Sequence, residues 1–131
     1  MDPSRSGAMP RGDETILVVE DEAAVRDVIV RVLGPLGYRI LSAPSGVEAL
    51  ELALATQPPP ALLLSDLVMP GMSGRALAAG LSAVLPDIKV LLISGHHPDD
   101  SEDEQAPAIL TKPFSPRALA QAVREALDST C

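Results

Sequence analysis

Short apolar runs recur along the chain, separated by longer segments of mixed character. The runs occupy residues 16–19, 61–64, 90–93 and 108–110, with a weaker one at residues 38–41. Near-continuous stretches of Val, Ile and Leu are typical of parallel strands that are buried on both faces. The pattern therefore predicts five strands of a parallel sheet.

The segments between these runs carry apolar residues at helical spacing. Over residues 25–36 the apolar positions follow i, i+3, i+4, i+7, i+8 and i+11, which line one face of a helix, and Gly37 follows as a C-cap. Three more helices are expected over residues 47–54, 74–85 and 116–127. The last of these has Ser115 as its expected N-cap and Pro116 in its first turn.

Alternating strands and helices with short connections imply right-handed crossovers and helices on both faces of one sheet. The length of 131 residues fits one domain with a core of its own. Residues 1–14 mix Pro, Gly, Ser and charge without periodicity, and we expect them to form a disordered leader or linker. The folded domain is expected over residues 15–128, with residues 129–131 as a tail.

The composition argues against several classes of partner. The chain carries 10 Lys and Arg against 18 Asp and Glu, so its formal charge is -8 and it repels nucleic-acid phosphates. Only Tyr38 and Phe114 could stack on a base. No apolar run approaches the roughly 20 residues of a membrane-spanning helix. We therefore expect a cytoplasmic monomer that binds no nucleic acid and does not insert into a membrane.

Charged and hydroxyl side chains follow four of the predicted strands at the point where each ends. These are Glu20 and Asp21 after the first run, Asp66, Ser94, and Lys112 near the end of the last run. The carboxyl ends of parallel strands share one edge of a sheet, where ligands bind in open α/β folds. One strand-end acid is usually a solvated loop residue, but this combination on four strands predicts a functional site.

The three acids at this edge require a way to relieve their mutual repulsion. Either their pKa values rise or a cation binds between Glu20, Asp21 and Asp66. Carboxylates without clustered Cys or His favour Mg²⁺ or Mn²⁺ over zinc. A carboxylate beside such an ion can act as a nucleophile and form an acyl phosphate. Lys112 then supplies positive charge, and the Ser94 hydroxyl can bond a phosphoryl oxygen.

Four motifs resemble the receiver domain of two-component response regulators. They are ILVVEDE at residues 16–22, SDLVMPGMSG at 65–74, LISG at 92–95 and TKPF at 111–114. The resemblance covers residues 15–128. The amino-acid sequences of these motifs are particularly similar to those in receivers of hybrid sensor histidine kinases. It implies a flavodoxin-like, doubly wound α/β fold, with a five-stranded parallel sheet of order 2-1-3-4-5 and helices on both faces.

The resemblance also implies a role for each residue of the site. Asp66 would be the phosphoacceptor for a histidine kinase or histidine phosphotransfer domain, possibly on the same polypeptide. Glu20, Asp21 and Asp66 would bind the metal together with the backbone carbonyl of Val68. Ser94 would be the switch hydroxyl and Lys112 the phosphoryl-binding cation. Such a domain assists its own phosphorylation and dephosphorylation and is not a free-standing enzyme.

Other functions on the same fold remain open at this stage. A small-molecule phosphatase of the haloacid dehalogenase type needs a second Asp where this chain has Val68. A flavin-binding protein needs a phosphate-binding loop where Glu20 and Asp21 would repel phosphate, and aromatic partners are nearly absent. A pseudo-receiver that only binds a partner would not need the complete set of site residues.

Two local features are also expected. We expect the Lys112–Pro113 peptide bond to be cis, since a tight turn must direct the Lys112 amine into the site. Residues 96–107, HHPDDSEDEQAP, contain five acids and no Val, Leu, Ile, Phe or Met. A helix needs an apolar face to pack on a domain, so we expect the fourth helix of the receiver pattern to be short or disordered here.

Overall fold

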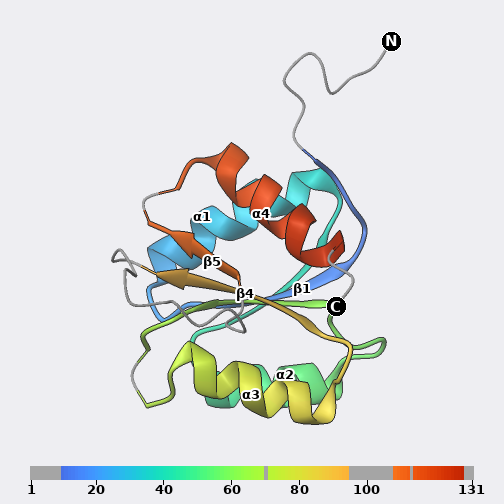
Figure 1. The fold of residues 1–131 in the computed structure, drawn as a ribbon, viewed down its shortest axis with the longest axis vertical. Coiled ribbons are helices and arrows are strands. Elements are labelled where there is room, and N and C mark those ends of the chain that lie inside the picture. The colour runs from blue at the N-terminus through green and yellow to red at the C-terminus, as the bar shows by residue number, and fades with distance from the viewer. Residues whose placement is uncertain (1–9, 70, 95–107, 113, 129–131) are drawn as a thin grey trace.

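A five-stranded parallel sheet forms the centre of the protein (Figure 1). The computed structural model describes residues 10–69, 71–94, 108–112 and 114–128. The strands are β1 (Thr15–Val19), β2 (Arg39–Ala43), β3 (Leu62–Asp66), β4 (Lys89–Ser94) and β5 (Ala108–Thr111). Their order in the sheet is β2-β1-β3-β4-β5. The predicted strands and their flavodoxin-like order are therefore confirmed.

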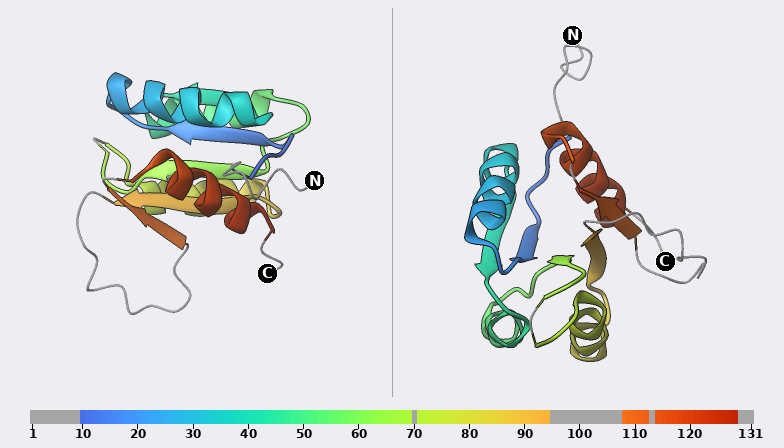
Figure 2. Two further views of the ribbon diagram at one scale, coloured as in Figure 1. Left: turned by 90° about the horizontal axis from the view of Figure 1, so that it is seen from above. Right: turned by 90° about the vertical axis from the view of Figure 1, so that its left-hand side faces the viewer.

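Helices cover both faces of the sheet, as Figures 1 and 2 show. They are α1 (Ala23–Leu33), α2 (Gly46–Ala55), α3 (Gly74–Val84) and α4 (Pro116–Asp128), with a 3₁₀ turn, η2 (Gly34–Leu36), after α1. Helices α1 and α4 pack on one face, and α2 and α3 pack on the other. The four predicted helices are confirmed, and α4 is the last of them.

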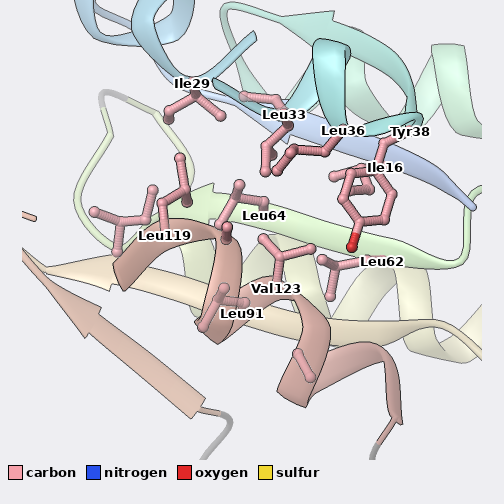
Figure 3. Packing of buried hydrophobic residues seen from close by; sticks show 14 residues of the cluster. Ile16, Ile29, Leu33, Leu36, Tyr38, Leu62, Leu64, Leu91, Leu119 and Val123 are labelled. Atoms are coloured by element: carbon pink, nitrogen blue, oxygen red, sulfur yellow. The ribbon is translucent and has the colours of Figure 1, made fainter. Parts of the chain in front are cut away.

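Side-chain alternation along the central strands divides the interior into two cores. In β1, Ile16 and Val18 face α1 and α4, whereas Leu17 and Val19 face α2 and α3. Figure 3 shows the first core, where residues such as Leu33, Leu64 and Leu119 meet between the sheet and its two helices. All five residues of β1 are buried, which explains why the strand carries no polar alternation.

The first segment with apolar residues at helical spacing folds into two consecutive elements, α1 and η2. Helix α1 ends at Leu33, and the chain continues through η2, which contains Pro35. Proline lacks the amide hydrogen that another α-helical turn requires. Gly37 ends the segment with a φ of 107° and donates its N–H to the Gly34 carbonyl at 3.0 Å. Gly37 is therefore the terminating glycine that the sequence predicts, as the cap of the 3₁₀ turn.

Serine residues cap the N-terminal ends of three helices, close to the sheet edge where the strands end. Ser45 accepts a hydrogen bond from Glu48 N, Ser73 from Ala76 N and Ser115 from Ala118 N. These bonds satisfy amide groups that have no partner within the helix. The predicted N-cap role of Ser115 is confirmed.

The chain before β1 is bound to the rest of the domain. Gly12 donates its N–H to Leu36 O at 3.1 Å, and the Arg11 guanidinium donates to Pro35 O at 3.3 Å. Arg39 N donates to Glu14 O at 3.0 Å. Hydrogen bonds, and not apolar periodicity, therefore hold residues 11–14 against the rest of the chain, and the expected domain boundaries stay predictions.

Several expectations concern parts of the chain outside the described residues. These are the structure of residues 1–9, 96–107 and 129–131, and the conformation of the Lys112–Pro113 bond. Within the described ranges, no helix has the length and hydropathy needed to span a membrane.

Candidate functional site

The structure brings the three predicted acids together at the carboxyl edge of the sheet. Glu20 and Asp21 directly follow β1, and Asp66 is the last residue of the neighbouring strand β3. One carboxylate oxygen from each lies within 4.8 Å of the others. Asp21 is exposed, whereas Glu20 and Asp66 are buried. The group therefore opens to solvent on the side of Asp21.

Asp66 is held by the backbone that surrounds it. Its Oδ1 accepts a hydrogen bond from Val68 N at 3.4 Å, and the following residue, Leu67, donates its N–H to Ile93 O at 2.8 Å. The loop after Asp66 returns to α3, where Gly74 N donates to Leu67 O at 2.9 Å. A Cβ on Gly74 would overlap the Asp66 carbonyl oxygen. This close approach explains why glycine begins α3.

Glu20 has a buried carboxyl group with a strongly perturbed pKa. Its Oε2 accepts from Glu22 N at 3.2 Å, but its Oε1 is buried and has no hydrogen-bond partner among the described residues. Burial raises the pKa of Glu20 to about 7, and the nearby charges of Asp66 and Asp21 add to this rise. A buried carboxylate oxygen without a donor, facing a second carboxylate, is the arrangement that a hard cation stabilises.

Lys112 supplies positive charge to the same site from the other side of β3. Its Nζ lies 3.6 Å from Asp66 Oδ2 and 3.8 Å from Glu20 Oε1. Both distances are ion-pair separations longer than a hydrogen bond. The Lys112 amide donates to Ser94 O at 2.7 Å, which connects the chain after β5 to the end of β4. The amine can therefore reach a group bound at Asp66.

Ser94 and Val68 flank Asp66 on two sides. Ser94 is buried at the end of β4, one residue beyond Ile93, which pairs with Asp66 in the sheet. Val68 lies in the loop after β3, and the residue is 76% exposed. The structure thus brings both residues to the predicted edge. The roles of the Ser94 hydroxyl and the Val68 carbonyl stay predictions.

Two methionines near Asp66 belong to the packing of the domain. Met69 is buried in the core beneath α2 and α3, and Met72 packs against the same core. The Met72 side chain also lies against Gly46, where an added Cβ would be 2.6 Å from its sulfur. On the opposite face, Phe114 packs against the first core behind Lys112.

Arg26 contacts the site and has no counterpart among the predicted residues. Its Nη1 donates a hydrogen bond of 2.6 Å to the backbone carbonyl of Glu20. Arg26 lies close to the start of α1, and no local pattern in the sequence points to its acceptor. Only the folded structure identifies that acceptor.

Comparison with known proteins agrees with this geometry. The family model described as the response regulator receiver domain matches residues 16–124. The chain belongs to this family. The match includes every residue of this receiver domain's candidate site, from Glu20 to Lys112.

Relatives of this receiver domain include both parts of larger proteins and single domains. It is 42% identical over 122 residues to the sensor kinase CckA of Brucella abortus, covering 89% of this chain but only 13% of that protein. It is 33% identical to the response regulator receiver protein CpdR of the same organism, covering 86% of this chain and 95% of the relative. This chain thus spans only a small part of the CckA kinase.

A solved structure has the same architecture. The crystal structure of the receiver domain from the hybrid histidine kinase CckA superimposes with a TM-score of 0.76 at 38% identity. The comparison covers 87% of this chain and 99% of that domain.

Proposed function

We propose that this receiver domain accepts a phosphoryl group on Asp66 from a phosphohistidine, with a divalent cation bound by the neighbouring acids. The observation that carries the proposal is the convergence of three carboxylates and the Lys112 amine at one sheet edge. Membership of the receiver family supports the same reaction. The domain would act in the cytoplasm, in two-component signal transduction.

The residues present fit Mg²⁺ or Mn²⁺. Glu20 offers a buried oxygen without a donor, Asp21 offers an exposed carboxylate, and Asp66 completes the group of oxygen ligands. The Val68 backbone carbonyl is the fourth ligand that we propose. When bound, the ion would offset the charge of these acids and of phosphoryl oxygens. Hard oxygen ligands of this kind favour it over zinc.

The transfer itself would take place at the Asp66 carboxylate. One Asp66 oxygen attacks the phosphorus, an O–P bond forms, and the P–N bond to the donor imidazole breaks. The imidazole leaves with the bonding electron pair and takes up a proton. Lys112 Nζ, 3.6 Å from Asp66 Oδ2, would offset negative charge on the transferred group. The Ser94 hydroxyl would donate to one of its oxygens.

The donor would be a histidine kinase or a histidine phosphotransfer domain. The names of two relatives support this class of partner, since one is a sensor kinase and one is the receiver of a hybrid histidine kinase. The donor could reside on the same polypeptide or on a separate protein. In both cases the receiver assists the transfer and does not turn over a substrate of its own.

Incubation with Mg²⁺ and acetyl phosphate tests the proposal without knowledge of the kinase. Intact-mass spectrometry should show one added phosphoryl group in the wild-type protein and none in Asp66→Asn. Omission of Mg²⁺ should abolish the addition. Phosphorylation of Asp66→Asn to the same level would refute the assignment of the phosphoacceptor.

The same experiment separates the alternatives. A small-molecule phosphatase would release inorganic phosphate catalytically in large excess over protein, whereas a receiver forms about one acyl phosphate per chain. A pseudo-receiver would give neither product. Beryllofluoride, which mimics a phosphoryl group on a carboxylate, should shift the amide signals of Leu67 and Val68 in the wild-type protein only.

A further inference from the structure

The peptide that joins Glu20 to Asp21 lies between two of the three acids of the site. Its carbonyl belongs to Glu20 and its N–H belongs to Asp21, so its orientation sets the directions of both side chains. Two adjacent carboxylates that must converge on one ion repel each other and Asp66. Without a restraint, this repulsion would rotate the peptide and separate the carboxylates.

Three hydrogen bonds restrain Glu20, and one of them comes from a charged side chain. Glu20 N donates to Ala43 O at 3.2 Å, and Glu20 Oε2 accepts from Glu22 N at 3.2 Å. The Glu20 carbonyl accepts from Arg26 Nη1 at 2.6 Å, which is the shortest of the three bonds. Charge-assisted hydrogen bonds are roughly twice as strong as neutral ones.

Arg26 and Lys112 place positive charge on different parts of Glu20. Lys112 faces its carboxylate, with Nζ 3.8 Å from Oε1. Arg26 instead bonds the carbonyl and forms no ion pair among the described residues. The neighbouring Asp27 pairs with Arg31 at 3.5 Å. The Arg26 contact therefore restrains the loop without occupying a carboxylate oxygen that an ion would need.

We propose that Arg26 is a positioning residue for divalent-cation binding, because its hydrogen bond sets the orientation of the Glu20–Asp21 peptide. This inference rests on the proposed function, which requires that the acids bind Mg²⁺. Arg26 is not a ligand, since a guanidinium has no lone pair available to a metal. It acts through the two acids whose backbone it holds.

The sign of the effect distinguishes this role from simple electrostatics. A cation close to a metal site repels the metal. If charge were the only effect of Arg26, its removal would therefore strengthen Mg²⁺ binding. Loss of a positioning bond would weaken it, because the acids must then be reoriented when the ion binds. Removal of a residue that orients metal ligands typically costs about 10-fold or more in metal affinity.

Titration of the full chain with MgCl₂, followed by amide NMR shifts of Leu67 and Val68, measures the affinity directly. Arg26→Met keeps an unbranched stem without the donor, and we expect binding about 10-fold weaker than in the wild type. Arg26→Lys keeps the charge and one donor group, and should lose less. Arg31→Met is the matched control, since it removes a positive charge from the exposed side of α1. It should bind Mg²⁺ as tightly as the wild type, or slightly more tightly.

The outcomes separate the two proposals. Absence of Mg²⁺ binding in the wild type would overturn the proposed function. Wild-type binding with equal or tighter binding by Arg26→Met would overturn the positioning role alone. In the metal-free protein, the Asp21 amide signal should also move in Arg26→Met and stay in place in Arg31→Met. If Arg26→Met does not fold, Arg26→Ala, which also lacks the donor, decides the question, because affinity equal to that of the wild type would refute the role.

Discussion

Arg124 of α4 and Glu14, which precedes β1, form a two-bond ion pair at the end of the sheet opposite Asp66. Arg124 Nη2 lies 2.7 Å from Glu14 Oε2, and Nη1 lies 3.2 Å from Oε1. Nη1 also donates to Arg11 O at 3.0 Å and to the Tyr38 hydroxyl at 3.3 Å. One guanidinium therefore joins the chain before β1 to the last helix and to the start of β2. We call these contacts the Arg124 cluster.

The ion pair should contribute measurably to stability because both side chains are largely buried. Their exposures are 23% for Arg124 and 29% for Glu14. We expect a coupling free energy of about 1 kcal/mol in a double-mutant cycle with Arg124→Met and Glu14→Gln. Urea unfolding of the four proteins measures it. A coupling below about 0.3 kcal/mol would mean that the pair makes no net contribution.

The same pair predicts a pH dependence. The hydrogen bonds from Arg124 lower the pKa of Glu14 below its ordinary value of 4.5. A carboxyl group whose pKa is lower in the folded state stabilises the fold above its unfolded pKa, and this contribution is lost as the pH falls through the folded value. The difference in unfolding free energy between the wild type and Glu14→Gln should therefore be present at pH 7 and shrink below pH 4.5. A difference that grows on acidification would contradict this assignment.

Substitution of Glu20 should have opposite effects on stability and on metal binding. Glu20→Gln removes a buried charge that faces Asp66, so we expect the metal-free protein to become more stable by about 1–3 kcal/mol at pH 8. The same change removes a proposed ligand, so Mg²⁺ should no longer raise the thermal midpoint. Differential scanning calorimetry with and without MgCl₂ tests both effects. A variant that keeps the full Mg²⁺ response would show that Glu20 is not a ligand.

Gly74 should be intolerant of a side chain because its backbone contacts the Asp66 carbonyl. Gly74→Ala forces the loop after Asp66 to move, which should cost about 1–3 kcal/mol and slow phosphorylation by acetyl phosphate. Gly34→Ala is a matched control, since an added Cβ there meets nothing within 4 Å and the φ of -57° suits alanine. The control should be neutral or slightly stabilising. Equal phosphorylation rates in both variants would contradict the constraint at Gly74.

Val68 should prolong the life of the phosphorylated state. Its exposed apolar side chain follows Asp66 by two residues and has no polar group to orient an attacking water. We expect Val68→Asn to shorten the half-life of phospho-Asp66 on the order of tenfold. Val84→Asn, which changes an exposed valine of α3, should leave it unchanged. Decay of ³²P-labelled protein at constant pH measures both. An unchanged half-life in Val68→Asn would disprove the argument.

The amino-acid sequence alone determined the strands, the helices and the sheet edge at which the candidate site residues lie. The runs that became β1, β3 and β4 are apolar at almost every position, which is typical of strands in a sheet covered on both faces. Parallel strands all end at one edge, so acids placed after separate runs had to meet there. Asp66 and Glu20 could therefore be assigned to one site before any distance was known.

The tertiary structure decided the contacts that depend on distant segments and carry no local pattern. Arg124 and Glu14 are 110 residues apart, and Arg26 reaches a carbonyl whose position depends on how α1 packs. Residues 11–14 lack periodicity, and hydrogen bonds to distant residues such as Leu36 hold them. Gly12 also lies against Gly37, where a side chain would collide with the Gly12 carbonyl. Burial of apolar surface repeats along a strand or helix and can be recognised in sequence. A hydrogen bond between remote groups requires that both be brought within about 3 Å, and only the folded chain does this.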